Sequence, residues 1–384
     1  MVDALRRGGT ALCTLLVVAA LLVPAPAALA SPTAPTLPAP TGDHPVGTGS
    51  TRLVDPGRAD PWKPDTPYRE LMVSLWYPAL LPWGERAPYL SEELSAAIIG
   101  SDFPAVPPEA FATVRTHATT RALPKPSGHG RPLVVLSPGF GASRTSLTTL
   151  AEDLASRGYV VAAIDHTYES PVEFPGGRIE PCLICADIDE ELAAEVVRSR
   201  ARDVSFVLDR LTDRRSPTGR LIDGSRIAMI GHSIGGAAAL ETMRTDPRVD
   251  AGMNMDGALY TGVPGGLDRP FLLFGARRVD HPELDPTWNR VWPRLTGWKR
   301  WLDVASGGHW TFSDAPWLAG NFPIREGLPP GQAERLLGSI EGERAVRVVR
   351  EYLAAFVVAH LRGQEDPLLD GPSPKYPEVS FVPG

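Results

Sequence analysis

Short apolar runs alternate with longer segments of helical periodicity through the middle of the chain. The apolar runs predict buried strands at 71–76, 133–136, 159–164, 227–230 and 270–274. Apolar residues that recur at intervals of three and four predict helices at 146–156, 191–211 and 343–361. Parallel neighbouring strands need such helical crossovers. The pattern therefore predicts an α/β fold with a doubly wound, mostly parallel sheet that helices cover on both faces.

The first thirty residues have the three-part layout of a secretory signal peptide. Arg6 and Arg7 precede an apolar run at 11–23, and the Ala-Leu-Ala segment at 28–30 is typical of a cleavage site. This run is shorter than the ~20 apolar residues of a membrane-spanning helix, and no later stretch approaches that length. We therefore expect a secreted chain that begins at Ser31 and has no transmembrane span.

The proline content and the net charge indicate how the rest of the chain is organised. Residues 31–47 contain five prolines and no apolar periodicity, which predicts an extended linker outside the core. Residues 48–384 suit one large α/β domain with insertions. Cleavage would remove Arg6, Arg7 and Asp3, so the formal charge of −7 becomes −8. An acidic chain is a poor partner for nucleic acid.

Cys182 and Cys185 are the two cysteines beyond the predicted signal peptide. In an exported protein a short-range disulfide is the favoured state of such a pair. A thiol redox pair is the alternative, but the neighbouring Asp187 and Asp189 disfavour a reactive thiolate. A zinc site would need two further ligands, which the neighbourhood lacks. We expect no cofactor and no metal.

The sequence Gly-His-Ser-Ile-Gly at 231–235 follows the apolar run at 227–230 and has the G-x-S-x-G pattern of a nucleophile elbow. In an elbow the serine occupies a sharp turn between a strand and a helix, where glycines relieve backbone crowding. The small and helix-forming residues at 237–240 fit the helix start. A glycine-rich turn that binds an anion has a similar pattern. The motif predicts an α/β-hydrolase fold with Ser233 as the nucleophile.

A serine nucleophile needs a general base, and the base needs a carboxylate that orients it. In sheet-based hydrolases these groups follow in the order serine, acid, histidine. Of the downstream histidines, His360 falls within the last predicted helix and His281 lies early in an insertion. His309 follows an apolar run at 301–304 and a Ser-Gly-Gly loop, which makes it the predicted base.

Two aspartates compete for the role of the acid. Asp256 follows the apolar run at 252–255, and Asp280 follows the strand predicted at 270–274. Both lie beyond strand ends, so topology alone leaves the choice open. Asp268 precedes its strand and is a poor candidate.

Acyl transfer also needs hydrogen-bond donors for the oxyanion. The backbone amide of Ile234, directly after the serine, is the first candidate. The second is the amide of Phe140, which lies between two glycines in the loop after the strand at 133–136. That loop would also suit a turn selected only for its tightness.

Two segments, 88–124 and 281–299, fit the strand-helix alternation poorly. We expect them to be insertions that shape the substrate entrance. Six of the nine tryptophans fall between positions 288 and 317. We expect core or loop packing for most of them, with an acyl-binding wall or a lipid-contacting patch as the functional alternative. These residues are Trp288, Trp292, Trp298, Trp301, Trp310 and Trp317.

Together these motifs resemble the platelet-activating factor acetylhydrolase family, in its bacterial, plasma and intracellular type II members. The resemblance spans about residues 50–362 and rests on these features: Leu-Met-Val-Ser-Leu-Trp-Tyr-Pro at 71–78, Gly-Phe-Gly-Ala at 139–142 with Arg144, the elbow at 231–236, Asp256, His309 and Phe-Ser-Asp at 312–314. It implies a calcium-independent serine esterase that cleaves short-acyl lipid or small esters through an acyl-serine intermediate. It also implies these roles: Ser233 as nucleophile, Asp256 as acid, His309 as base, Phe140 and Ile234 as oxyanion donors.

Two other functions compete with this interpretation. Bacterial cutinases and polyester or triglyceride lipases share a similar elbow and oxyanion loop, and in them the acid follows the later strand, which would be the role of Asp280. A catalytically silent hydrolase fold used for binding is the alternative outside enzymes. The expected partners are an ester substrate and, transiently, a lipid surface; the sequence does not indicate an oligomeric state.

Overall fold

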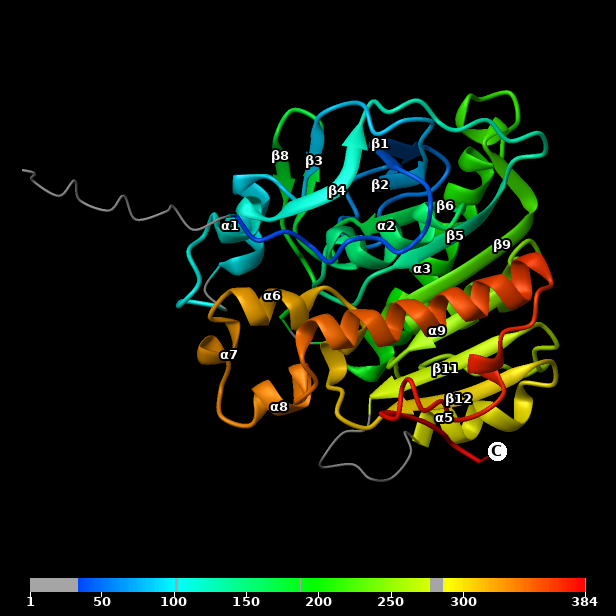
Figure 1. The fold of residues 1–384 in the computed structure, drawn as a ribbon. Helices are drawn as coiled ribbons and strands as arrows, with labels where there is room; N and C mark the ends of the chain where they lie inside the picture. Colours follow the sequence, from blue (N-terminus) through cyan, green and yellow to red (C-terminus); the bar gives the residue numbers. More distant parts are fainter. Residues whose placement is uncertain (1–33, 101–102, 187, 277–285, 384) are drawn as a thin grey trace, which may run out of the picture. The chain divides into compact units, whose positions relative to one another are not determined.

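The computed structural model describes residues 34–100, 103–186, 188–276 and 286–383 (Figure 1). Its centre is an eleven-stranded sheet in the order β13-β12-β11-β10-β9-β5-β6-β2-β1-β4-β3. The strands are β1 (Val46–Asp55), β2 (Arg69–Pro78), β3 (Arg86–Pro88), β4 (Arg115–Thr120), β5 (Arg131–Ser137), β6 (Val160–His166), β9 (Ile222–His232), β10 (Ala251–Met255), β11 (Phe271–Ala276), β12 (Lys299–Val304) and β13 (Val379–Phe381). A separate hairpin joins β7 (Val172–Phe174) to β8 (Arg178–Glu180).

The helices are α1 (Glu92–Ile99), α2 (Thr148–Ser156), α3 (Glu190–Leu211), α4 (Ile234–Thr245), α5 (Pro286–Val291), α6 (Ala315–Asn321), α7 (Ile324–Gly327), α8 (Gln332–Leu337) and α9 (Gly342–Arg362). The helices predicted at 146–156, 191–211 and 343–361 match α2, α3 and α9 within a few residues. Gly363 ends α9 with a φ of 65°, a conformation that glycine adopts without strain.

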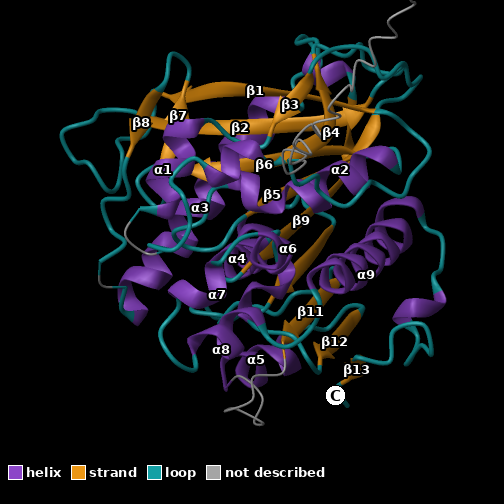
Figure 2. Cartoon of the chain, turned by 60° about the vertical axis from the view of Figure 1, so that its left-hand side comes forward, coloured by secondary structure: helices purple, strands orange, loops and turns teal. Residues whose placement is uncertain are grey.

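The strands from β6 through β5, β9, β10 and β11 to β12 are parallel, and β2 joins them antiparallel. Alternate residues of β5 enter different cores: Val134 and Leu136 pack with α2 and α9, whereas Leu133 and Val135 pack with α3 and α4. Figure 2 shows α4 and α9 on opposite sides of the strands. The predicted α/β-hydrolase fold, with its doubly wound and mostly parallel sheet, is confirmed.

The proline-rich segment is packed against the domain, which corrects the expectation of a linker outside the core. Residues 34–45 have little regular secondary structure, but Leu37 is only 2% exposed and lies in an apolar core cluster. Thr41 donates hydrogen bonds to Asp153 of α2, and Arg350 of α9 donates to two carbonyls of the segment. Residues 34–47 therefore belong to the same compact unit as the rest of the domain. The predicted signal peptide lies outside the described residues.

The two predicted insertions differ in structure. Residues 88–124 hold α1, but they also contribute β4, which pairs with β1 and belongs to the main sheet. In the other insertion, α5 packs into the core through Trp288, whose ring lies 5.1 Å from that of Trp301. The expectation of packing is confirmed for these two tryptophans.

The structure joins Cys182 and Cys185 in a disulfide directly after β8. Within its loop, the Leu183 amide donates to the carbonyl of Tyr168, 2.9 Å away. Among the described residues, no helix is long and apolar enough to cross a membrane.

Candidate active site

Ser233 occupies the sharp turn that the motif predicts. It follows the last residue of β9 and caps α4, with φ 55° and ψ −128°. This is a strained conformation for a residue with a side chain, and such strain is common at catalytic sites. A Cβ atom on Gly231 would lie 2.0 Å from the backbone of Gly235, so only glycine fits there. The Ser233 amide donates to the carbonyl of Met255, which ties the turn to β10.

His309 and Asp256 complete a chain of hydrogen bonds from this serine. His309 Nε2 lies 3.0 Å from Ser233 Oγ, and His309 Nδ1 lies 2.6 Å from Asp256 Oδ2. Because the carboxylate can only accept, we assign the imidazole proton to Nδ1. The Nε2 atom is then the acceptor that faces the serine hydroxyl. The Ala276 amide donates to Asp256 Oδ1 and holds the carboxylate in place.

Of the other candidates for base and acid, the structure describes Asp268 and His360. Asp280 and His281 lie outside the described residues. Asp268 is exposed and precedes β11. His360 packs within α9 against Trp298, with ring centroids 4.3 Å apart, and burial lowers its pKa to about 4. His360 thus has the packing role expected of a histidine in the last helix.

No sequence pattern assigns a role to His232, which occupies a variable position of the elbow motif. Its side chain is 4% exposed and its Nε2 atom donates to the carbonyl of His309, 2.7 Å away. The two imidazole rings lie 4.9 Å apart. His232 therefore anchors the loop that carries His309. Sequence gives no signal for this contact, because the two residues are 77 positions apart.

Of the two predicted oxyanion donors, Ile234 follows Ser233 in the chain and Phe140 lines the same cavity as Ser233. Ile234 is the first residue of α4, and the first amides of a helix have no acceptor within it. In the part of the chain that the structure describes, the Phe140 amide has no acceptor either. Gly141, with φ 74°, lets the chain turn directly after Phe140. Both amides are thus available to an incoming oxyanion.

A cavity of about 330 Å³ lies beside Ser233 and His309, and most of its wall is apolar. One part of the wall comes from α1 and its neighbours, so the segment 88–124 shapes the cavity beside Ser233. The described part of 281–299 does not line this cavity, contrary to expectation, and of the six tryptophans only Trp310 does. The large apolar lining residues are Tyr89, Leu90, Ile98, Phe103, Phe111, Phe140, Trp310, Leu318 and Ile324.

Asp314 lies next to this cavity and contacts Tyr89, one of its lining residues. Its carboxyl group is fully buried and accepts hydrogen bonds from the amide and hydroxyl of Thr149. It also accepts from the hydroxyl of Tyr89, 3.2 Å away. Burial raises the pKa of Asp314 to about 7.

Among the described residues, no cluster of three His, Cys, Asp or Glu side chains has the arrangement of a metal site.

Comparisons with known proteins identify esterases among the proteins that this chain resembles. Residues 94–173 match the family described as platelet-activating factor acetylhydrolase, isoform II. A probable 1-alkyl-2-acetylglycerophosphocholine esterase of Arthroderma benhamiae is 32% identical over 266 residues, which are 66% of this chain and 67% of that protein. The platelet-activating factor acetylhydrolase of Canis lupus familiaris is 27% identical over 67% of this chain and 63% of its own length.

A solved structure extends the similarity over nearly the whole chain. The ferulic acid esterase from Streptomyces cinnamoneus is 53% identical and superposes with a TM-score of 0.84. The match covers 91% of this chain and 100% of that one. The curated relatives, in contrast, match over about two thirds of their length.

Proposed function

This chain belongs to the platelet-activating factor acetylhydrolase family of esterases, and we propose that it hydrolyses carboxylic esters with Ser233 as nucleophile, His309 as base and Asp256 as acid. The observation that carries this proposal is the pair of hydrogen bonds that connects these three side chains beside an apolar cavity. A hydroxyl, an imidazole and a carboxylate in this order are the groups that acyl transfer through a serine requires.

In the first half of the reaction, Ser233 Oγ attacks the carbonyl carbon of the ester and its proton passes to His309 Nε2. The negative charge that develops on the carbonyl oxygen is stabilised by the amides of Phe140 and Ile234. Asp256 stabilises the positively charged imidazole. When the tetrahedral intermediate collapses, His309 returns the proton to the leaving oxygen. The alcohol departs and leaves an acyl group on Ser233.

In the second half, water replaces the alcohol. His309 Nε2 takes a proton from the water molecule, whose oxygen attacks the acyl carbon. The same two amides stabilise the second oxyanion. Collapse breaks the bond to Ser233 Oγ, which recovers its proton from His309, and the carboxylic acid leaves.

The size and the apolar lining of the cavity favour an ester with a compact, apolar acyl group. Its volume of about 330 Å³ is at the small end of the usual range for ligand sites, and aromatic side chains make up much of its wall. A short aliphatic acyl chain, as on a short-acyl lipid, fits this description. An aromatic acyl group is the second candidate, because planar rings pack well against Phe103, Phe111 and Trp310. The 53% identity to a ferulic acid esterase favours that candidate.

We also propose that the chain is secreted after cleavage of residues 1–30 behind Ala30. The basic, apolar and small-residue regions of that segment support the proposal. Transient contact with a lipid surface would follow if the substrate is a lipid. N-terminal sequencing of protein recovered from the culture medium tests cleavage directly: the expected first residue is Ser31, and a chain that retains residues 1–30 would contradict the proposal.

Substrate class is tested with a panel of esters. The panel comprises p-nitrophenyl esters from acetate to palmitate, methyl ferulate, and a phospholipid with an acetyl group at its second position. We expect kcat/KM to be highest for the short acyl chains or for the ferulate, and low for palmitate. A maximum at palmitate, or activity on a polyester film above that on every small ester, would favour the lipase-like or cutinase-like function instead. Absence of hydrolysis across the panel would favour a binding protein.

A further inference from the structure

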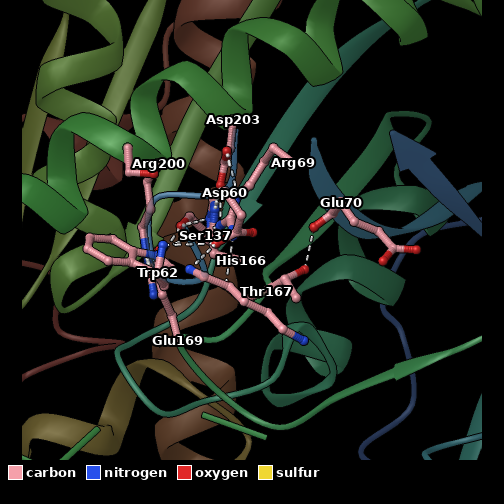
Figure 3. Close-up of polar contacts among 12 residues, drawn as sticks. Asp60, Trp62, Arg69, Glu70, Ser137, His166, Thr167, Glu169, Arg200 and Asp203 are labelled. Atoms are coloured by element: carbon pink, nitrogen blue, oxygen red, sulfur yellow. Dashed lines mark hydrogen bonds and ion pairs between the residues drawn. The ribbon is translucent and has the colours of Figure 1, made fainter. Parts of the chain in front are cut away.

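A network of buried charges lies behind the loop that carries Phe140 (Figure 3). We call residues 137–141 the oxyanion loop. The network consists of two arginines and three carboxylates, each at most 3% exposed. Charged side chains are rarely buried to this extent unless they are paired. The members of the network are Asp60, Arg69, Glu169, Arg200 and Asp203.

Arg200 and Glu169 form the part of the network that contacts the oxyanion loop. Arg200 Nε donates to Glu169 Oε2, 2.6 Å away, and Arg200 Nη1 donates to the carbonyl of Pro138, 2.5 Å away. The backbone carbonyl of Glu169 accepts from the Gly141 amide at 2.9 Å. The Arg200 side chain thus anchors the chain before Phe140, and the Glu169 backbone anchors it after Phe140.

A second set of contacts holds the start of the loop. Ser137 Oγ lies 3.0 Å from His166 Nε2, and His166 Nδ1 lies 2.8 Å from Asp203 Oδ2. Figure 3 shows these groups converging around Ser137 together with Arg200, whose Nη1 atom donates to Ser137 Oγ. The set has the same residue types as a catalytic triad, but Ser137 is 0% exposed and cannot meet a substrate.

The protonation states in this second set follow from its surroundings. Burial lowers the pKa of His166, so its imidazole is neutral. Asp203 accepts two hydrogen bonds from Arg69 and keeps its negative charge. The His166 proton therefore lies on Nδ1, and Nε2 accepts from the Ser137 hydroxyl. Each of these hydrogen bonds then has one donor and one acceptor.

The start of α4 also packs closely against the oxyanion loop. A Cβ atom on Gly235, in the first turn of α4, would lie 2.1 Å from the Ser137 carbonyl oxygen. The helix that begins at the nucleophile therefore packs directly on the loop. With α4 on one side and the charged network on the other, the position of the Phe140 amide depends on both.

We propose that Arg200 and Glu169 are positioning residues that hold the Phe140 amide where it can donate to the oxyanion. The proposal rests on the proposed function, because it needs an oxyanion formed at Ser233. Burying an ion pair is costly, and apolar residues of similar size often stabilise a fold equally well. Here the Arg200 guanidinium, which the Glu169 carboxylate orients, donates to the Pro138 carbonyl, and an apolar side chain could not replace that hydrogen bond.

The test compares Arg200→Met, Arg200→Lys and Glu169→Gln with the wild type. Arg198→Met is the matched control, because Arg198 lies on the same helix with its side chain exposed. Titration with diethyl p-nitrophenyl phosphate first counts the folded, reactive sites in each preparation. We then measure kcat, KM and the inhibition constant of a trifluoromethyl ketone, which binds serine esterases as an oxyanion adduct. Labelling of wild-type Ser233 by the phosphate ester tests the proposed function separately.

For Arg200→Met we expect kcat per titrated site to fall by about 10²-fold, the loss typical of one oxyanion donor, with KM little changed. The inhibition constant of the ketone should rise by the factor by which kcat/KM falls, because both depend on the oxyanion. Arg200→Lys and Glu169→Gln should lose less, and Arg198→Met nothing.

Two results would overturn the proposal. One is a loss of activity that disappears when rates are expressed per titrated site, since the network would then contribute only to stability. The other is an unchanged affinity for the ketone in a variant whose kcat has fallen. If Arg200→Met does not fold, Glu169→Gln decides, because it keeps the shape of the side chain while it weakens the ion pair. Equal kcat and ketone affinity in that variant and in the wild type would refute the positioning role.

Discussion

His309 Nδ1 lies 2.6 Å from Asp256 Oδ2, although 53 positions separate the two residues in the chain. This contact orients the imidazole with its Nε2 atom toward Ser233. Asp256→Asn would keep the shape of the side chain but favour the wrong imidazole tautomer. We expect kcat to fall by about 10⁴-fold, as measured with p-nitrophenyl acetate, while the thermal unfolding midpoint changes little.

Asp280→Asn is the control for this assignment, because Asp280 is the other aspartate in the right order along the chain. We expect that variant to retain most of the wild-type kcat. A large loss in Asp280→Asn together with a small one in Asp256→Asn would reverse the assignment and indicate a lipase-like arrangement of the acid.

Leu318 lies on α6, lines the cavity and is 7% exposed. Leu318→Trp should fill part of the space that an acyl group occupies. We expect kcat/KM for acyl groups larger than acetyl to fall by roughly tenfold or more, since even one methylene in an apolar pocket changes rates by that order. The acetate ester, which needs little of the cavity, serves as the internal control. Equal losses for acetate and for bulkier esters would show that the cavity is not the acyl site.

Asp314 predicts a pH-dependent difference in stability. Its pKa rises from 3.8 in the unfolded chain to about 7 in the fold, because burial disfavours its charged form. The folded state therefore binds this proton more tightly, and the associated stability is complete below pH 4 and lost as the pH rises to about 7. Asp314→Asn has no such proton and should gain stability relative to the wild type across that window.

Unfolding midpoints of both proteins between pH 4 and pH 8 provide the measurement. Both proteins carry Glu152→Gln in this comparison, because burial also raises the pKa of Glu152 to about 7 and the charge of Asp314 raises it further. Curves that stay parallel over the whole range would mean that Asp314 is charged in the fold at every pH tested.

The disulfide between Cys182 and Cys185 closes a loop of four residues. Loops this short restrict the unfolded chain only modestly, so the bond is expected to stabilise the fold by about 2 kcal/mol. Cys182→Ser should therefore lower the unfolding midpoint and leave kcat/KM nearly unchanged. If the wild type reduced a disulfide substrate such as insulin, and Cys182→Ser did not, the pair would have the redox role that its sequence context disfavours.

The parts of the molecule that follow local rules could be predicted from the sequence. Apolar runs placed the central strands, and the glycines of the elbow placed Ser233 at the end of one of them. His309 could be selected because few histidines follow the serine. The acid could not be selected in this way, because β10 and β11 end at the same edge of the sheet and each is followed by an aspartate.

The parts that depend on contacts between distant segments were missed. Arg200 has the spacing of a polar position on an amphipathic helix, and periodicity does not reveal that a carboxylate from another element meets it inside the fold. Leu37 is a single apolar residue among prolines, yet it anchors the segment 34–47 to the core. In both cases the partner lies far away in the sequence, so no local pattern marks the contact.

The central claim is that Ser233 carries the acyl group during turnover. The most direct measurement is kcat/KM of Ser233→Ala on p-nitrophenyl acetate, with circular dichroism and the unfolding midpoint as evidence of an intact fold. Loss of a nucleophile from a working triad lowers turnover by on the order of 10⁴- to 10⁶-fold, and we expect a loss in that range. A folded Ser233→Ala protein that keeps wild-type activity would contradict the account.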